Sequence, residues 1–303
     1  MDVDVVVIGA GPAGLAAALN LARQQRTVAL VDSNRPRHAA TLQSHGFITR
    51  DGISPLELRS LGREEVLRYP TVTHERALVR QIVAVDDGFA VQSEQPGSRA
   101  ETETRAAAVL IATGLSETLP LSKHVRPWYG TSLHSCMDCD GYDKRGQALA
   151  LIGETPDLVD RAMVIRRHTD DLAVFTNGSD AVDEAGARRL AEHGVTLERT
   201  PIAAIEGDRD GMRAIVLEDG ERSERTGGFV RPWWHPQLEF AEALGLETDA
   251  DGLVVVDRMQ RASTPGIYAA GDITPGFRQL AVAAGAGTIA ASVINRNLIA
   301  RER

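Results

Sequence analysis

Short runs of consecutive apolar residues recur along the chain and predict strands of a parallel sheet that are buried on both faces. These runs cover residues 4–8, 27–31, 109–111, 148–153, 172–175, 252–256 and 266–272. Between them, the pattern predicts helices over residues 15–23 and 279–297, and the mixed charges at 184–199 predict a helix with a solvated face. Strands that alternate with helices in this way indicate an α/β fold.

The composition is that of an ordinary globular protein with two domains. The chain has 303 residues, 43% hydrophobic and 25% charged, which excludes disordered and fibrous classes. A formal net charge of −9 without a long basic run argues against a nucleic-acid partner. The most apolar stretch, residues 5–22, is interrupted by glycines and a proline, and no basic segment precedes it. We therefore expect a cytoplasmic protein with no membrane partner and no signal peptide.

The first predicted strand runs directly into a glycine-rich turn, Gly9-Ala10-Gly11-Pro12-Ala13-Gly14, and the strand after the next helix ends at Asp32. In such a unit Gly9 permits the tight turn, Gly11 lets a pyrophosphate approach the backbone, and Gly14 lets helix and strand pack closely. The helix start offers free N–H groups to phosphates. Asp32 is placed to accept hydrogen bonds from ribose hydroxyls. The segment therefore predicts a dinucleotide site.

Motifs elsewhere in the chain favour FAD over NAD as the ligand of this site. Ala112-Thr113-Gly114 closes the strand at 109–111, and Gly271-Asp272 closes the last predicted strand. An aspartate at such a turn can hold a ribityl hydroxyl, while the start of the following helix faces the pyrimidine edge of a flavin. Together these segments resemble the FAD-binding motifs of flavoproteins with two dinucleotide-binding domains.

Both cysteines lie in one segment, His134-Ser135-Cys136-Met137-Asp138-Cys139-Asp140. Such a pair can be a redox dithiol, half of a metal site or a coincidence, but a zinc site would lack its second pair of cysteines, so we expect no metal. Two thiols at this spacing can close a disulfide, and a nearby charge or helix start can lower the pKa of one thiol. Asp140 is placed to shuttle the proton released, or to cap the following helix. We interpret the pair as redox-active.

Taken together, these motifs are similar to those of the low-molecular-weight thioredoxin reductase family. The resemblance covers essentially the whole chain and includes Phe277-Arg278-Gln279 after Gly271-Asp272. It implies an α/β fold with two Rossmann-like dinucleotide-binding domains, FAD as cofactor and a homodimer. It also implies a discontinuous FAD domain, residues 1–115 and 240–303, with an inserted NAD(P)-type domain, residues 116–239, that carries the dithiol.

The resemblance also implies roles for individual residues. Cys139 would lie against the flavin C4a position, and Cys136 would exchange with the substrate. Asp140 matches the proton-handling acid of the family. Arg278 and Gln279 match its flavin-contacting pair at a helix start.

One segment departs from the family pattern. After the strand at 148–153, a second nucleotide fingerprint is expected, but the chain reads Gly153-Glu154-Thr155-Pro156-Asp157-Leu158. A Cβ at Thr155 would obstruct a pyrophosphate, and Glu154 brings negative charge toward phosphates. The basic cluster for an NADPH 2′-phosphate is replaced by Thr176-Asn177-Gly178. We favour a domain that keeps the fold without ordinary NADPH binding; the alternative is a diverged loop that binds NADPH by other contacts.

Relatives of thioredoxin reductase that lack pyridine nucleotide motifs include dithiol oxidases of the gliotoxin and holomycin type, which pass electrons to oxygen. Others are reductases fed by ferredoxin or a deazaflavin. His45-Gly46-Phe47 and the segment Arg50 to Pro55 look more like the dithiol-oxidase branch. Asp140, in contrast, is the reductase-type residue at a position where that branch commonly has His.

The predicted function is therefore an FAD-dependent thiol–disulfide oxidoreductase that does not rely on NADPH, with dithiol oxidation by oxygen as the first choice. One alternative is an NADPH-dependent thioredoxin reductase, and another is a non-catalytic redox-sensing flavoprotein. The substrate would be a dithiol or disulfide, carried by a small molecule or a thioredoxin-like protein. His45 and His134 could each act as a base near the dithiol or be structural. The aromatic segment 231–236 could line a cleft, cover the unused nucleotide site or connect the domains.

Overall fold

The computed structural model describes residues 2–98 and 101–302, which divide into two compact units. Within that range, the first unit contains the residues up to 39, residues 46–116 and those from 235 onward, and the second contains residues 40–45 and 117–234. The strands β7 (Leu115–Thr118) and β16 (Trp233–Pro236) pair at the two points where the chain passes between the units. The aromatic segment at 231–236 therefore forms part of an interdomain connection. The domain boundaries proposed at 115 and 240 stay a prediction, but residues 40–45 group with the second unit.

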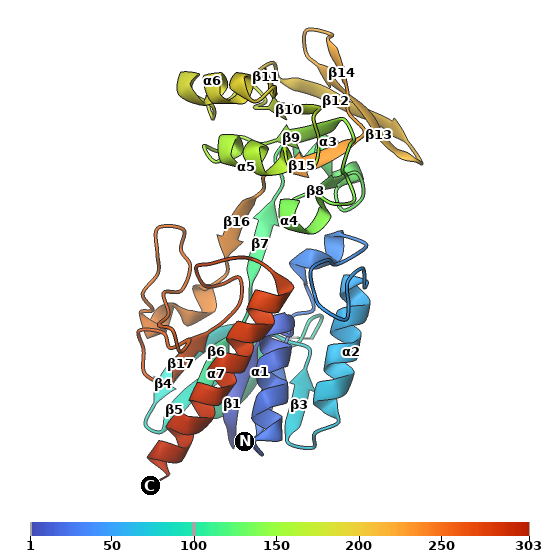
Figure 1. Ribbon diagram of the computed structural model, residues 1–303. Coiled ribbons are helices and arrows are strands. Elements are labelled where there is room, and N and C mark those ends of the chain that lie inside the picture. The colour runs from blue at the N-terminus through green and yellow to red at the C-terminus, as the bar shows by residue number, and fades with distance from the viewer. Residues whose placement is uncertain (1, 99–100, 303) are drawn as a thin grey trace. The chain divides into compact units, whose positions relative to one another are not determined.

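The first unit is built on a seven-stranded sheet in the order β3-β2-β1-β6-β5-β4, with β17 also paired to β6 (Figure 1). β1, β2, β3, β6 and β17 run parallel, and β4 and β5 extend the sheet in antiparallel fashion. The bounds of these strands are β1 (Asp2–Ile8), β2 (Val28–Val31), β3 (Val72–Glu75), β4 (Leu78–Val85), β5 (Gly88–Glu94), β6 (Glu101–Ile111) and β17 (Ile267–Ala269).

Both faces of the central strand β1 are buried, as its uninterrupted apolar run predicts. Val5 and Val7 pack into one hydrophobic core and Val6 and Ile8 into another on the opposite face. Against the first of these cores, α1 (Pro12–Arg23) lies beside α7 (Leu280–Arg301) (Figure 1). The remaining helices of the unit are α2 (Pro55–Leu67), η1 (Arg37–Ala40), whose last residue groups with the second unit, and η3 (Glu239–Leu244).

The second unit combines a parallel sheet with a small antiparallel one. The parallel sheet has the order β11-β10-β9-β15-β8, and the other sheet has the order β12-β13-β14. The strand bounds are β8 (Leu133–His134), β9 (Leu149–Ile152), β10 (Leu172–Phe175), β11 (Thr196–Glu198), β12 (Ile202–Asp208), β13 (Gly211–Leu217), β14 (Arg222–Glu224) and β15 (Gly227–Val230). The helices are α3 (Ser122–Val125), η2 (Arg126–Trp128), α4 (Met137–Asp140), α5 (Leu158–Ile165) and α6 (Glu184–Glu192).

The predicted α/β fold class, with a nucleotide-binding type of sheet in each unit, is confirmed, and two element predictions are wrong. Residues 252–256 form no extended strand but only an isolated bridge from Val254 to Thr248, because the Asp249 side chain accepts from the backbone N–H groups of Asp251 and Leu253 and holds a turn. The helix predicted over 184–199 ends at Glu192, since Gly194 adopts φ +68° and the chain continues into β11. No helix in residues 2–98 and 101–302 is long and apolar enough to cross a membrane.

Candidate functional site

The glycine-rich turn between β1 and α1 has the geometry that its three glycines predict. Gly9 has φ +104°, and a Cβ there would lie 2.4 Å from the carbonyl oxygen of Ala112. A Cβ on Gly14 would lie 1.8 Å from the carbonyl oxygen of Gly9. A Cβ on Gly11, in contrast, would have no atom within 4 Å. The turn is therefore packed at its first and third glycines and open at its second, where a pyrophosphate would approach.

Pro12 and Ala13 begin α1 and bring its start toward other predicted cofactor residues. Pro12 occupies the first helical position, where its missing N–H costs no hydrogen bond. A Cβ on Gly271, which has φ +83°, would lie 3.0 Å from the Cβ of Ala13. A Cβ on Gly287 of α7 would lie only 2.0 Å from the carbonyl oxygen of Ala13. These close approaches place the turn after β17 and the helix α7 next to the start of α1.

Asp32, directly after β2, is held by three donors. Its Oδ1 accepts from the backbone N–H of Ala10 at 3.1 Å, and its Oδ2 accepts from the backbone N–H of Asn34 at 3.1 Å. The guanidinium of Arg59 donates to the same Oδ2 at 2.8 Å. Oδ1 keeps acceptor capacity for a ribose hydroxyl, because a carboxylate oxygen has two lone pairs.

Arg59 on α2 contacts both Asp32 and the glycine-rich turn, and the sequence analysis did not predict it. Besides Asp32, its Nε donates to the carbonyl oxygen of Ala10 at 3.3 Å and its Nη1 to Oδ1 of Asn34 at 3.2 Å. The residue is only 4% exposed, and burial lowers the pKa of its guanidinium although Asp32 opposes that effect. No local sequence signal marks it, because α2 lies far from the turn along the chain.

The segments after β6 and β17 supply the other predicted cofactor residues. Thr113 and Gly114, which has φ +64°, follow β6, and the Oγ1 of Thr113 is buried without a hydrogen-bond partner in the part of the chain that the structure describes. Asp272 forms an ion pair with Arg37, Oδ2 to Nη2, at 2.5 Å. Arg37 thus contacts the residue that is predicted to hold a ribityl hydroxyl.

Arg278 and Gln279 precede α7, and Gln279 is its N-cap residue with extended backbone. The first unit thus brings all the predicted FAD-binding residues into one domain. The open space over Gly11, the unpartnered hydroxyl of Thr113 and the free acceptor capacity of Asp32 fit a dinucleotide. FAD bound there supplies reversible two-electron chemistry.

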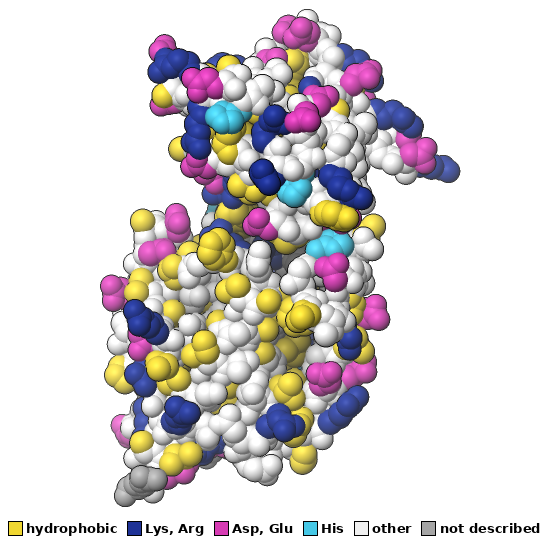
Figure 2. All heavy atoms as spheres, in the orientation of Figure 1, with side chains coloured by type: hydrophobic (Ala, Val, Ile, Leu, Met, Phe, Trp, Pro, Cys, Tyr) yellow, Lys and Arg dark blue, Asp and Glu magenta, His cyan; other side chains and the backbone are white. Residues whose placement is uncertain are grey.

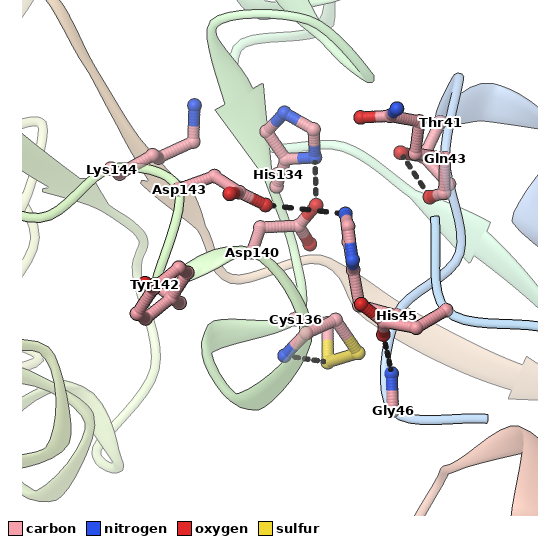
Figure 3. Close-up of polar contacts among 12 residues, drawn as sticks. Thr41, Gln43, His45, Gly46, His134, Cys136, Asp140, Tyr142, Asp143 and Lys144 are labelled. Carbon is pink, nitrogen blue, oxygen red and sulfur yellow. Dashed lines mark hydrogen bonds and ion pairs between the residues drawn. A yellow bond between two sulfur atoms is a disulfide. The ribbon is translucent and has the colours of Figure 1, made fainter. Parts of the chain in front are cut away.

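In the second unit, Cys136 and Cys139 form a disulfide with an S–S distance of 2.05 Å (Figure 3). Cys136 directly precedes the short helix α4, and its Sγ accepts from the backbone N–H of Cys139 at 3.2 Å. A hydrogen bond to sulfur favours the thiolate over the thiol. The local backbone therefore stabilises negative charge on Cys136 whenever its sulfur is released as a thiolate.

Asp140, the last residue of α4, contacts His134 on β8. Its Oδ1 lies 2.9 Å from Nδ1 of His134, and the side chains are 12% and 11% exposed (Figure 3). The other ring nitrogen of His134, Nε2, lies 2.6 Å from the carbonyl oxygen of Thr131. His134, one of two histidines considered from the sequence, is thus in direct contact with the predicted proton-handling acid.

Two more charged residues, Asp143 and Lys144, follow Asp140 along the chain. Lys144 is 8% exposed, its Nζ donates to the carbonyl oxygen of Thr131 at 3.4 Å, and burial lowers the pKa of its ammonium group although Asp140 and Asp143 raise it. His45 is the second histidine considered, and its Nε2 lies 3.2 Å from Oδ2 of Asp143 (Figure 3). The sequence analysis did not single out Lys144 or Asp143.

The turn between β9 and α5 differs from the turn between β1 and α1. Its Asp157 carboxylate accepts from Oγ1 of Thr155 at 2.6 Å, from Nε of Arg161 at 2.7 Å and from Nε of Arg231 at 2.8 Å. Burial opposes the charged form, but these three hydrogen bonds outweigh it and lower the pKa of Asp157 to about 2. A fixed carboxylate therefore sits at the start of α5.

Comparison with known proteins identifies relatives along the full chain. Thioredoxin reductase sirT from Leptosphaeria maculans is 29% identical over 96% of this chain and 93% of its own length. The thioredoxin reductase of Mycolicibacterium smegmatis is also 29% identical, over 95% of this chain and 94% of its own.

Solved structures agree with these relatives. The crystal structure of HlmI matches with a TM-score of 0.91 and 34% identity, covering 99% of this chain and 94% of that one. Thioredoxin reductase from Streptococcus pyogenes matches with a TM-score of 0.88 and 25% identity, covering 99% of both chains. The thioredoxin reductase-like fold is therefore confirmed.

The family model described as "Pyridine nucleotide-disulphide oxidoreductase" matches residues 3–287. Homologues of this type are FAD-binding flavoproteins, which confirms FAD as the expected cofactor. The chain is accordingly an oxidoreductase acting on disulfides. By sequence, by fold and by its cysteine pair, this protein belongs to the pyridine nucleotide-disulphide oxidoreductase family and is thioredoxin reductase-like.

Proposed function

We propose that this protein is an FAD-dependent dithiol–disulfide oxidoreductase that exchanges electrons through Cys136 and Cys139 without using NADPH. The first choice of reaction is oxidation of a dithiol, with oxygen as the final electron acceptor. The observation that carries the proposal is the carboxylate of Asp157, held at the start of α5 by Arg161 and Arg231. Helix starts in nucleotide-binding domains normally receive phosphates, and a fixed carboxylate repels them.

The two arginines near this turn, Arg161 and Arg231, already contact other side chains. The guanidinium carbon of Arg231 lies 4.1 Å from the ring centroid of Trp234, and that of Arg161 lies 5.5 Å from it. Both arginines also donate to Asp157. A phosphate that used these cations would have to displace Asp157, and that carboxylate is tethered to the same backbone.

The loop after β10 supports the same conclusion. Asn177 follows β10 at the position where the family places basic residues; its Nδ2 donates to Oε1 of Glu154 at 2.9 Å, and its Oδ1 accepts from the backbone N–H of Ile202 at 3.1 Å. Thr176, the residue before it, is fully buried. The side-chain amide of Asn177 thus connects the loop after β10 with Glu154 and with Ile202. The segment Thr176-Asn177-Gly178 contains no cationic side chain that could bind a 2′-phosphate.

The proposed exchange balances in two steps. A substrate thiolate attacks Sγ of Cys136, the Cys136–Cys139 bond breaks, and Cys139 leaves as a thiolate with the bonding electron pair. The second substrate sulfur then attacks the first, releases Cys136 and closes the substrate disulfide. The substrate has lost two electrons and two protons, and the enzyme dithiol holds the electrons. Oxygen takes up two electrons and two protons to give hydrogen peroxide and so restores the enzyme.

An NADPH-dependent thioredoxin reductase remains the second candidate, because the curated relatives carry that name and the second unit keeps a parallel sheet. The experiment that separates the two is anaerobic titration of the FAD-loaded protein, followed by flavin absorbance. NADPH should leave the flavin oxidised, dithiothreitol should bleach it or produce a charge-transfer band, and admission of air should reverse the change. Bleaching by NADPH would reject our proposal in favour of the reductase.

The same titration has a matched control and tests the non-catalytic alternative. The Cys136→Ser/Cys139→Ser variant should keep its flavin spectrum and lose the response to dithiothreitol. Repeated turnover of a dithiol in air excludes a redox sensor, whereas a single stoichiometric colour change without turnover would contradict an enzymatic role.

We further propose a cytoplasmic homodimer that acts on a small dithiol or a thioredoxin-like protein. Apolar side chains are exposed on the face of the first unit that carries α7 (Figure 2), among them Val282 and Ile289, which stand seven residues apart on one side of that helix. This apolar face supports a second copy as its partner. Sedimentation of the FAD-loaded protein tests it, and a monomer at micromolar concentration would contradict it.

A further inference from the structure

The contact between Nδ1 of His134 and Oδ1 of Asp140 requires a proton between the two atoms. The carbonyl oxygen of Thr131 can only accept a hydrogen bond, so Nε2 of His134, 2.6 Å away, carries a proton. In a neutral imidazole the other nitrogen, Nδ1, is then bare. It faces Oδ1 of Asp140 at 2.9 Å, and a carboxylate oxygen is also only an acceptor.

Two acceptors cannot form a hydrogen bond, so this contact holds one additional proton. The pair is either an imidazolium with a carboxylate or a neutral imidazole with a carboxylic acid. Both forms have the same number of protons and no net charge. Since both side chains are close to nine-tenths buried, the unprotonated pair, with its net negative charge, is disfavoured.

The backbone of this pair adjoins that of the two cysteines. Asp140 directly follows Cys139, and its backbone N–H donates to the carbonyl oxygen of Cys136 at 3.2 Å. His134 lies two residues before Cys136 on β8, so both partners flank the disulfide along the chain (Figure 3).

We propose that His134 is a positioning residue that lets Asp140 keep one transferable proton at neutral pH, and that this proton is delivered to Cys136 during dithiol exchange. This rests on the proposed function. When the second substrate thiol attacks the mixed disulfide, the bond to Cys136 breaks and Sγ takes the shared proton. The proton of the attacking thiol then refills the pair, so the step is balanced and the pair is unchanged after turnover.

Other titratable groups surround the pair and define the background of any pH measurement. Lys144 donates to the same carbonyl of Thr131, and Asp143 forms an ion pair with His45. Asp138 is exposed on α4, and a Cβ on the neighbouring Gly141 would lie 2.5 Å from Nε2 of His168. Lys144 is coupled to the pair, because burial lowers the pKa of its ammonium group and the charge of Asp140 opposes that effect. Every variant in the test therefore keeps Lys144.

The test is the pH profile of flavin reduction by dithiothreitol under anaerobic rapid mixing. We expect a bell-shaped profile in which the rising limb belongs to the dithiothreitol thiol and the falling limb to loss of the shared proton. His134→Asn retains an amide that can donate to Asp140 but cannot share a titrating proton. Its falling limb should move to lower pH by about one unit or more, because Asp140 must then hold the proton alone. The rate at pH 8 should fall about 10- to 100-fold.

A structural role for His134 predicts a different result, since the hydrogen bond of His134→Asn would restore the wild-type profile; that outcome overturns the inference. Asp140→Asn should lose about 100-fold or more, and the double variant should be no slower than Asp140→Asn because the pair acts as one unit. Additive losses would also overturn it. His193→Asn, at the end of α6, is the matched histidine control and should behave as wild type. If the wild-type protein itself shows no reduction by dithiothreitol, the proposed function fails rather than this inference.

Discussion

Arg59 and Asp32 form a buried ion pair that joins helix α2 to the end of strand β2, with 2.8 Å between Nη2 and Oδ2. The same guanidinium donates to the carbonyl oxygen of Ala10 in the glycine-rich turn. A single side chain therefore sets the position of both the carboxylate that we expect to bind ribose and the turn that we expect to bind phosphate. None of the FAD-binding residues that the sequence predicts lies on α2.

Replacing Arg59 by Met should weaken FAD binding by about tenfold or more and lower the free energy of unfolding by about 3–5 kcal/mol, because Asp32 would remain as a buried carboxylate without its cation. Fluorescence titration of the apoprotein with FAD and urea unfolding measure the two effects. Arg68→Ala, at an exposed position at the end of the same helix, is the control and should change neither. Unaltered FAD affinity in Arg59→Met would show that the ion pair does not position Asp32.

Substitutions at two glycines of the first turn should have different effects, one on folding and the other on FAD binding. Gly14→Ala forces a methyl against the carbonyl oxygen of Gly9, so we expect a loss of several kcal/mol of unfolding free energy. Gly11→Ala meets open space and ordinary backbone at φ −82°, so folding should be nearly unchanged. Its methyl would nevertheless project where the pyrophosphate approaches, and FAD affinity should fall at least tenfold. Thermal unfolding of the apoprotein and FAD titration test the contrast; equal FAD affinity in Gly11→Ala and wild type would contradict the assigned site.

The two cysteines should differ in function although they form one disulfide. We expect Cys136→Ser to bind FAD normally and to lose exchange with dithiols, because the serine oxygen cannot form the mixed disulfide. The measurement is turnover of dithiothreitol in air together with the flavin spectrum. Ser135→Ala, a neighbouring substitution that spares both thiols, is the control for local disturbance. Normal turnover of Cys136→Ser would refute its role as the exchanging thiol.

Asp157 should contribute to stability in a defined range of pH. Its folded pKa is about 2, below the value of about 4 for an unfolded aspartate. A depressed carboxyl pKa stabilises the fold above the unfolded pKa, and the stabilisation is lost as the pH falls from about 4 to about 2. Asp157→Asn should therefore unfold at lower temperature than wild type at pH 7, and the difference should shrink below pH 4. The side chain is partly exposed, so solvent screening keeps the effect modest.

Thermal unfolding of both proteins between pH 7 and pH 2.5 tests this dependence. Asp180→Asn, at an exposed position in the same unit, should match wild type throughout. A difference between Asp157→Asn and wild type that stayed constant down to pH 2.5 would contradict the ion pairs with Arg161 and Arg231.

Much of the fold and part of the site could be predicted from sequence because the signals are local. The apolar runs of β1, β9 and β10 and the glycine-rich turn each lie within a few consecutive residues, where steric demands on the backbone restrict the residue types. The Cys136–Cys139 pair is likewise local, since the two cysteines are only three positions apart along the chain. The strand predicted at 252–256 is wrong because the side chain of Asp249 holds a turn, which an apolar pattern does not reveal.

By itself, the sequence determined the fold class, the dinucleotide turn, the cysteine pair and the absence of a normal second fingerprint. The tertiary structure alone decided the partners of the charged groups: Arg37 with Asp272, 235 residues away, and Arg231 with Asp157, 74 residues away. It also decided that His134 meets Asp140. The physical reason is that an ion pair or a shared proton depends on which side chains the packed helices and strands bring within about 3 Å, and many residues throughout the core determine that packing.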